Sequence, residues 1–257
     1  MESKFEFAKQ LIREAGQLIL NHLSDELVVE EKGRFDDLVT SLDKEVQDFL
    51  VTEIHKHYPA DAILAEENNL RHSVTDGKVW VLDPIDGTVN FIVQRDYFAI
   101  LIAYYKDGLG QFGLIYDVIN DRLFHGGGIF DVYMNDELLS PYQDKPLSRS
   151  LIGGNSGMYA QNEHGIRDFI QQSLGLRVYG GAGISMGYVL TGKLMAYFSY
   201  LQPWDYAAAK ILGDKLGYVL LTLDGNEPDF THRQKVMFVP KVKLALIKKA
   251  ISSHENS

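Results

Sequence analysis

Apolar side chains recur along the chain with two different periods, which predict a mixture of helices and strands. In the N-terminal part they follow the helical spacing, and this predicts helices at 3–23 and 41–57. Ser3 and Glu6 have the spacing of a capping box that would open the first helix. Short apolar runs separated by turn residues then predict strands at 62–65, 79–82, 98–105, 110–116, 122–125 and 131–134.

The second half of the chain alternates helix and strand patterns. Residues 141–150 are polar and contain two prolines, which favours a boundary between the halves. Beyond it the pattern predicts strands at 151–153, 176–179 and 194–199, and helices at 166–174, 185–191 and 203–216. We therefore expect an N-terminal α+β half (1–145) with an antiparallel sheet and a C-terminal α/β half (146–257) with a smaller sheet, packed as one compact unit.

Composition narrows the functional classes. The 257 residues are 46% hydrophobic, which is typical of a globular chain with a sizeable core. The excess of 35 acidic over 25 basic residues gives a net charge of −10, which argues against direct binding to nucleic acid. There is no cysteine, signal peptide or apolar run of membrane length in the sequence, so we expect a soluble cytoplasmic protein.

Carboxylates stand where predicted apolar strands end. Glu67 follows one strand, and Asp83 and Asp86 follow the next, with a Gly-Thr pair directly behind them. Clustered carboxylate oxygens suit hard divalent cations, and free amides at a Gly-Thr turn suit an anion. Each acidic residue alone has an ordinary explanation in a loop, a turn or the first turn of a helix, as for Asp205. Together they indicate metal-assisted phosphoryl chemistry.

Four sequence motifs carry a resemblance to the inositol monophosphatase family. Residues 83–91 match its central motif, D-P-[ILV]-D-G-T-x-N-[FY], at every position. Residues 65–67 (A-E-E) correspond to its G-E-E motif, and residues 204–209 correspond to its W-D-x-A-A-G motif. Residues 37–43 match its D-L-V-T-x-x-D motif. The resemblance implies an α/β fold, an alternating α-β-α-β-α sandwich of the inositol monophosphatase and fructose bisphosphatase type. It also implies a homodimer, dependence on Mg²⁺ and inhibition by Li⁺.

The resemblance further implies a site for two or three Mg²⁺ ions. Glu67, Asp83 and the backbone carbonyl of Ile85 would hold the first ion. Asp83, Asp86 and Asp205 would hold the second, and a third, looser ion would share Glu67. A metal-activated water would then attack phosphorus in line, and no covalent nucleophile would be required.

The resemblance also assigns the phosphate-binding and catalytic residues. The amides of Gly87 and Thr88 would bind the phosphate at a helix N-terminus. Thr88, polarised by Asp43, would orient the attacking water, so that Thr88, Asp43 and Glu67 form the implied catalytic set. Two further residues are candidates for this site, Lys32 near the phosphate and Glu66 beside Glu67.

The implied substrate site departs from that of inositol-specific relatives. Its expected residues are Asp86, Gly183, Ser185, Ser199 and Asp205. Gly183 and Ser185 belong to a predicted loop at 180–185. Inositol-specific relatives have a glutamate that hydrogen-bonds inositol where this chain has Phe198 and Ser199. Loss of a polar partner weakens recognition of a hydroxyl, so the catalytic set is complete and the inositol-recognising set is not.

Three functions follow from this resemblance. The first is a phosphoric monoester hydrolase that converts inositol phosphate and water to inositol and phosphate. The second keeps this mechanism on NADP, adenosine 3′,5′-bisphosphate or a sugar phosphate, for which the aromatic residues around Phe198 would suit a flat substrate. The third is a binding role in RNA processing or transcription, against which the acidic net charge argues. A small phosphate ester is the expected partner, without membrane association.

Overall fold

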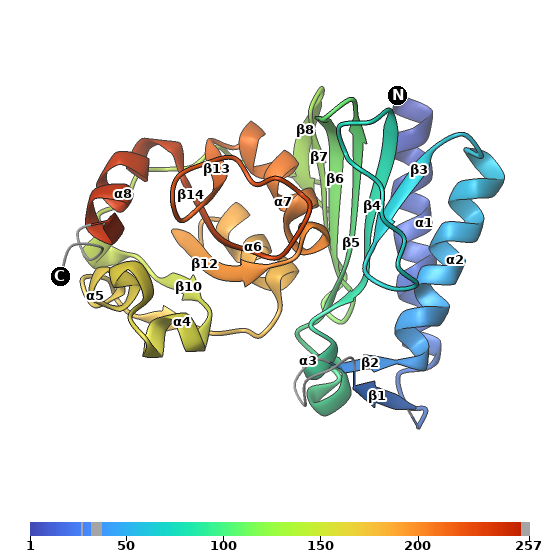
Figure 1. Cartoon of the computed structure of the whole chain (residues 1–257), viewed down its shortest axis with the longest axis horizontal. Coiled ribbons are helices and arrows are strands. Elements are labelled where there is room, and N and C mark those ends of the chain that lie inside the picture. Colours follow the sequence, from blue (N-terminus) through green and yellow to red (C-terminus); the bar gives the residue numbers. More distant parts are fainter. Residues whose placement is uncertain (27, 32–37, 253–257) are drawn as a thin grey trace.

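Helices and sheets alternate in layers through the molecule. The computed structural model describes residues 1–26, 28–31 and 38–252. Two helices cover one face of a seven-stranded sheet, and two more lie between this sheet and a five-stranded one (Figure 1). Short helices cover the far side of the second sheet. Within the described residues, no helix combines the length and apolar character needed to cross a membrane.

The outer layer beside the first sheet consists of α1 (Glu2–Asn21) and α2 (Ser41–His57), as the helical spacing predicts. The expected capping box at Ser3 and Glu6 is wrong, because α1 begins at Glu2 and Ser3 already lies inside the helix. The capping box is found instead at the start of α2, where Thr40 and Asp43 bond each other's backbone amides.

The seven-stranded sheet has the order β3-β4-β5-β6-β7-β8-β9. Only β3 and β4 pair in parallel, and the other neighbours are antiparallel, as expected for this half. Side chains alternate along β4: Trp80 packs toward α1 and α2, whereas Val81 packs toward the central helices. The strands are β3 (Ala62–Ala65), β4 (Lys78–Asp86), β5 (Ala99–Lys106), β6 (Leu109–Asp117), β7 (Arg122–Gly127), β8 (Phe130–Met134) and β9 (Glu137–Leu138).

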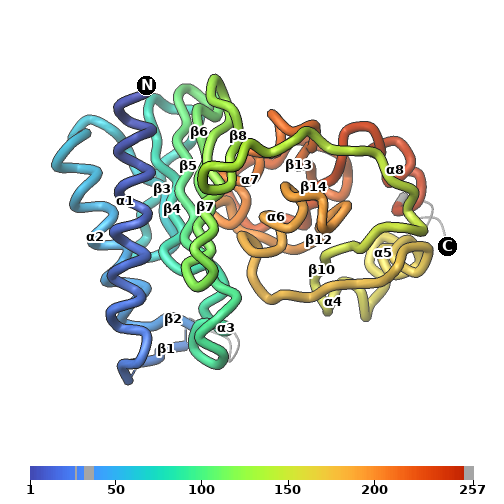
Figure 2. Tube along the Cα trace, turned by 180° about the vertical axis from the view of Figure 1, so that it is seen from behind, coloured from blue at the N-terminus to red at the C-terminus, as the bar shows by residue number. Residues whose placement is uncertain are grey.

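The five-stranded sheet has the order β11-β10-β12-β14-β13. It mixes parallel pairs around β10 with antiparallel pairs around β14. The strands are β10 (Ile152–Gly154), β11 (Leu176–Arg177), β12 (Ala196–Leu201), β13 (Tyr218–Thr222) and β14 (Gln234–Pro240). The last two were not predicted. After β8 and the short β9, the chain crosses to β10 in a long connection that can be followed in Figure 2. The division of the chain at residue 145 stays a prediction.

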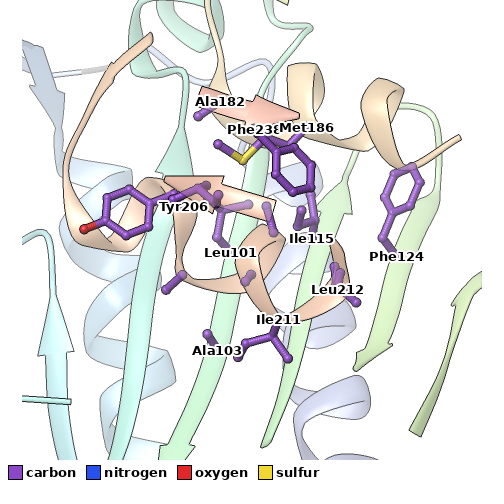
Figure 3. Close-up of a cluster of buried hydrophobic side chains, with 14 of the residues drawn as sticks. Leu101, Ala103, Ile115, Phe124, Ala182, Met186, Tyr206, Ile211, Leu212 and Phe238 are labelled. Carbon is purple, nitrogen blue, oxygen red and sulfur yellow. The ribbon is translucent and has the colours of Figure 1, made fainter. Parts of the chain in front are cut away.

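The central layer consists of α6 (Ala182–Leu190) and α7 (Pro203–Lys215), which pack against both sheets. Figure 3 shows Leu101, Ile115 and Phe124 of the first sheet meeting Ile211 and Leu212 of α7, all of them buried. This shared apolar contact fixes the start of α7 relative to the ends of the strands, and burial of apolar area supplies most of its stability.

The remaining elements are short. α4 (Ser156–Ala160), α5 (Ile166–Ile170) and α8 (Leu244–Ser252) cover the outer face of the second sheet. β1 (Val29–Glu31), β2 (Leu38–Thr40) and α3 (Thr88–Gln94) lie together at one end of the first sheet (Figure 1). The 3₁₀ turns are Leu147–Arg149, Glu163–Gly165 and Lys241–Lys243. The helix predicted at 166–174 ends early, at Ile170, where the Ser173 hydroxyl donates to the Ile170 carbonyl and closes a turn.

The contact between β6 and α7 gives a first testable prediction. A Cβ atom at Gly113 would lie 2.5 Å from the carbonyl oxygen and 2.9 Å from the Cα of Ala208. We expect Gly113→Ala to lower the free energy of unfolding by about 1–3 kcal/mol, because backbone atoms of α7 must shift to admit it. Urea unfolding measures this effect. Gly157→Ala is the control, since its Cβ would meet only Asn155 Oδ1 within 4 Å, and equal loss in both variants would contradict the prediction.

Candidate metal centre

A bulge at the end of β4 places two carboxylates together. Asp83 pairs with Leu101 of β5 and Asp86 with Ala99, so two residues of β4 occupy the place of one partner residue. Proline has no N–H to donate, and a proline inside a strand is tolerated at such a bulge. β4 therefore extends four residues beyond the predicted end, and both Asp83 and Asp86 leave it at the same edge of the sheet.

The third carboxylate comes from the other half of the chain. Asp205 is the third residue of α7, and its Oδ2 accepts a hydrogen bond from the Gln202 amide at 2.8 Å. Pro203 opens the helix with the φ angle that a first helical turn needs. One carboxylate oxygen from each of Asp83, Asp86 and Asp205 lies within 4.8 Å of the others. The structure thus brings together three of the sequence-predicted metal ligands.

This cluster disfavours its own ionised form when no cation is present. Burial raises the pKa of Asp83 well above its usual range, and the charges of Glu66, Asp86 and Asp205 raise it further. Burial and the charge of Asp86 do the same to Asp205, although the charge of Arg233 lowers its pKa in part. Burial raises the pKa of Asp86 to about 6, against the lowering effect of two amide hydrogen bonds.

One oxygen of the cluster has no partner. Asp83 is 1% exposed, and within the described residues its Oδ1 atom is buried without a hydrogen bond. A buried, unpaired carboxylate oxygen is costly unless a cation or water satisfies it. A set of hard oxygen donors with a spare lone pair fits Mg²⁺ rather than a soft metal. The residues therefore fit the metal that the sequence implied.

Asp86 also joins the two halves of the molecule. Its carboxylate accepts hydrogen bonds from the amides of Ala182 (2.9 Å) and Gly183 (2.7 Å) at the start of α6. The helix therefore begins three residues before the predicted start, and the expected loop at 180–185 is wrong from Ala182 onward. A carboxylate at a helix N-terminus is favoured by the macrodipole and satisfies orphan amides.

Glu66 and Glu67 follow β3, beside the end of β4. The parallel pairing sets Ala65 opposite Leu82, so the segment carrying Glu67 leaves the sheet next to Asp83. Glu67 is buried, but it is not a member of the close group of three carboxylates. Its charge raises the pKa of Asp43, after burial and against the hydrogen bonds of Thr40 and Thr88 that lower it.

Gln47 is a residue of this site that the sequence did not indicate. It is fully buried in α2, and its side-chain amide donates to the Glu67 carbonyl (2.7 Å) and accepts from the Glu67 amide (2.8 Å). Both backbone groups of Glu67 are thereby fixed. Its polar side chain stands at an otherwise apolar position of the helix, and this sequence feature could have indicated its role in the site.

Thr88 and Asp43 form a hydrogen-bonded pair beside the cluster. The Thr88 hydroxyl lies 3.1 Å from Asp43 Oδ1 and 3.1 Å from the Ile85 carbonyl oxygen. Asp43 Oδ2 also accepts from the amide (2.9 Å) and the hydroxyl of Thr40. Gly87 precedes α3 with a φ of +90°, a conformation that favours glycine. This turn brings the hydroxyl of Thr88 back toward α2.

Two of the expected substrate residues, Ser185 and Ser199, are as buried as the proposed metal ligands. The Ser185 hydroxyl is 1% exposed and donates to the Gly181 carbonyl at 2.7 Å. Ser199 is 4% exposed on β12, and Phe198 beside it is fully buried. Their roles, like the role of Gly183, stay predictions. Lys32 lies outside the described residues.

Asn90, inside the central motif, makes a second link between the halves. Its Nδ2 donates to the carbonyls of Tyr97 (2.9 Å) and Tyr179 (2.7 Å), and these residues lie on different halves of the chain. The rings of Tyr97 and Tyr179 stack with centroids 6.2 Å apart. Asn90, the second residue after the Gly-Thr pair, therefore has a structural role where the two halves meet beside the metal centre.

Comparison with known proteins agrees with this geometry. A model described as the inositol monophosphatase family matches residues 1–256. Inositol-1-monophosphatase of Bacillus subtilis is 35% identical over 239 residues, covering 90% of each protein. The structure of inositol monophosphate-bound SaIMPase-II superposes with a TM-score of 0.87 at 30% identity, over 99% of this chain and 96% of that one. An IMPase/NADP phosphatase complexed with Mg²⁺ and phosphate gives 0.84 at 25% identity, over 95% and 92%.

These likenesses confirm the expected fold class. The alternating α-β-α-β-α sandwich of the inositol monophosphatase and fructose bisphosphatase type is the fold observed here. The family resemblance read from the four motifs is confirmed as well, because the matching family model spans nearly the whole chain.

The raised pKa values predict how the metal-free protein responds to pH. Asp83, Asp86 and Asp205 hold protons in the folded state that they release in the unfolded state. The unfolded state therefore binds fewer protons, and stability falls as the pH rises from about 4 through 6 and above. In EDTA we expect Asp83→Asn to unfold at a higher temperature than the parent at pH 7.5. The free energy of unfolding should rise by on the order of 1 kcal/mol or more, since a shift of one pKa unit corresponds to about 1.4 kcal/mol.

Added Mg²⁺ should reverse that order, because a cation stabilises only a folded state that binds it. Differential scanning calorimetry with and without Mg²⁺ measures both effects. Asp224→Asn is the control, since Asp224 is exposed and does not belong to the carboxylate group. A parent protein whose stability in EDTA is flat or rising between pH 4 and 7 would contradict the account of the buried charges.

Proposed function

The chain belongs to the inositol monophosphatase family, and from that premise we propose that it hydrolyses small phosphate monoesters with Mg²⁺ as cofactor. The observation that carries the proposal is the group of buried Asp83 and Asp86 with half-buried Asp205, in which one oxygen of Asp83 is unpaired. Such a group is costly in a protein without a cation. In a phosphatase it binds the cations that neutralise the charge of the phosphate.

The carboxylates and one carbonyl would hold two or three Mg²⁺ ions. Glu67, Asp83 and the Ile85 carbonyl are the proposed ligands of the first ion, and Asp83, Asp86 and Asp205 those of the second. The bulge that separates Asp83 from Asp86 supports the role of Ile85, whose carbonyl already lies on the side of Thr88. When bound, Mg²⁺ supplies charge neutralisation on phosphate oxygens and acidifies water.

The remaining residues bind the phosphate and position water. We assign the amides of Gly87 and Thr88 to the phosphate, as in the resemblance. The Thr88 hydroxyl can accept a hydrogen bond from water while it donates to Asp43, which stays oriented by its bonds to Thr40. Asp43 thus holds Thr88 in one rotamer, and Glu67, fixed through Gln47, completes the proposed catalytic set.

The substrate of this reaction is a small phosphate ester, for whose alcohol portion there are several candidates. Inositol 1-phosphate is the first ester to test, because the Bacillus relative bears that name. NADP, adenosine 3′,5′-bisphosphate and sugar phosphates are the alternatives on the same scaffold. Ser199 supports them, since this hydroxyl leaves no carboxylate at the place where inositol-specific relatives have one, whereas Phe198 packs against Phe169 in the core under the outer helices. Cytoplasmic location and a homodimer stay predictions, and light scattering of the purified protein tests the latter.

Phosphate release by the purified protein with Mg²⁺ tests the proposed activity directly. The panel holds inositol 1-phosphate, fructose 1,6-bisphosphate, NADP, adenosine 3′,5′-bisphosphate and glycerol 2-phosphate, each repeated with EDTA. We expect turnover that EDTA abolishes on at least one ester. No turnover across the panel would favour the binding role instead.

Replacement of Asp205 should remove turnover without unfolding the chain. We expect Asp205→Asn to lower kcat/KM by about 10³-fold or more, because charge stabilisation by a bound metal is worth several kcal/mol. The Asn side chain keeps an oxygen for the Gln202 amide, so circular dichroism should stay unchanged. Asp214→Asn, on an exposed turn of the same helix, is the matched control. Near-normal turnover by Asp205→Asn would remove Asp205 from the metal site.

The Thr88 hydroxyl should be needed for the chemical step. We expect Thr88→Val to lower kcat by about 10²- to 10⁴-fold, the range typical of a lost proton-transfer group, with a smaller change in KM. Thr88→Ser keeps a hydroxyl near Asp43 and should lose far less. Stopped-flow phosphate release separates kcat from KM. Equal kcat values in the Val and Ser variants would show that the hydroxyl does not position water.

A further inference from the structure

A cavity of about 630 Å³ opens from the metal centre toward the second sheet. Asp205 belongs both to the carboxylate group and to the lining of this cavity, so the two are continuous. Its rim carries three cationic side chains, Arg71, Arg233 and Lys235. An ester whose phosphate lies on the metal centre would extend its alcohol portion into this space.

Two of these cations form no close ion pair among the described residues, although the charge of Arg233 acts on Asp205. Lys235 pairs with Glu163 at 2.8 Å. Within the described parts of the chain, neither Arg71 nor Arg233 has a carboxylate oxygen within ion-pair distance. Among the described residues, Arg13, Arg122 and Arg167 are the arginines that form ion pairs, so an unpaired arginine is common in this chain. What sets Arg71 and Arg233 apart is that both line one cavity beside the carboxylate group.

Both guanidinium groups are held in place by aromatic rings instead. Arg71 lies 4.7 Å from the ring centroid of Trp204 and donates to the backbone carbonyls of Ala65 and Leu70. Arg233 lies 4.5 Å from the ring of Tyr200, and its Nε donates to the Tyr200 carbonyl at 3.0 Å. Stacking orders a guanidinium without neutralising its charge and leaves its other N–H groups to a ligand.

We propose that the substrate carries a second phosphate group on its alcohol portion, and that Arg71 and Arg233 bind it. This inference rests on the proposed phosphatase function and narrows its substrate class to bisphosphorylated small molecules. A planar, multiply donating guanidinium is the side chain best suited to phosphate oxygens. Tyr200, which is 40% exposed, also lines the cavity and supplies flat apolar surface there.

Matched pairs of esters test the proposal. The pairs are adenosine 3′,5′-bisphosphate with adenosine 3′-monophosphate, fructose 1,6-bisphosphate with fructose 1-phosphate, and inositol 1,4-bisphosphate with inositol 1-phosphate. We expect kcat/KM for the bisphosphate to exceed that for the monophosphate by about tenfold or more in at least one pair, as one charged hydrogen bond would give. Ratios of two or less in all pairs would overturn the proposal, because two equivalent esters alone give that factor.

Variants locate the second phosphate. In the preferred pair, Arg71→Gln combined with Arg233→Gln should reduce the ratio to two or less, mainly through a higher KM for the bisphosphate. Raising NaCl should lower the parent's ratio, since the contact is charged and exposed. Arg149→Gln, on an exposed 3₁₀ turn away from this cavity, is the control that should keep the ratio. A ratio that survives in the double variant would overturn the assignment of these two arginines.

Failure of the proposed function gives a different result from failure of this inference. If no ester of any pair is hydrolysed with Mg²⁺, the phosphatase proposal falls and the second-phosphate site falls with it. If monophosphates are hydrolysed in an EDTA-sensitive way without preference for bisphosphates, the phosphatase proposal stands and only the second-phosphate site is refuted.

Discussion

Mutual repulsion among Asp83, Asp86 and Asp205 is the constraint on which the rest of the site depends. Their oxygens lie within 4.8 Å of one another in a buried environment, where like charges interact strongly. Hydrogen bonds from backbone amides orient Asp86 and Asp205, but they do not bring the three carboxylates together. β4 is locked between β3 and β5, and α7 is locked between the two sheets, so the packing of the whole molecule holds the carboxylates against their repulsion. A cation that binds between them relieves this repulsion, and the relief adds to the affinity for the cation. Metal binding and the packing of the core are therefore coupled.

The same carboxylates also organise the backbone around them. Asp86 caps α6, Asp205 bonds the Gln202 amide before α7, and Asp43 caps α2 while it holds Thr88. Each acid therefore has one oxygen or one lone pair engaged with a helix start, and its orientation is set before any ligand arrives. A site assembled from helix starts and strand ends has little freedom to collapse when the metal leaves, because the elements that carry it are buried on both faces.

The sequence predicted local elements well and long-range ones poorly. The spacing in α2 and the short apolar run of β3 determine those elements by themselves, and their bounds match the structure. The start of α6 depends on a carboxylate 96 residues earlier in the chain, which no local pattern reveals. Asp83 and Asp86 were recognisable from the end of an apolar run, whereas Asp205 was recognisable only from the family motif. Gln47 was overlooked because its partner is the backbone of Glu67, and β13 was overlooked although its apolar run could have indicated a strand.

The distribution of charge explains how an acidic protein can receive an anionic ester. A net charge of −10 repels phosphate at long range, and the carboxylate group would repel it at short range. Bound Mg²⁺ would offset the short-range repulsion of phosphate, but only at the metal centre. The remainder of the cavity needs positive charge that its own acids do not cancel, and a guanidinium paired with a carboxylate could not supply it. Arg71 and Arg233 avoid that pairing because Trp204 and Tyr200 hold them instead. Aromatic stacking here takes the place that a salt bridge has elsewhere on the surface, and it leaves the charge available to a ligand.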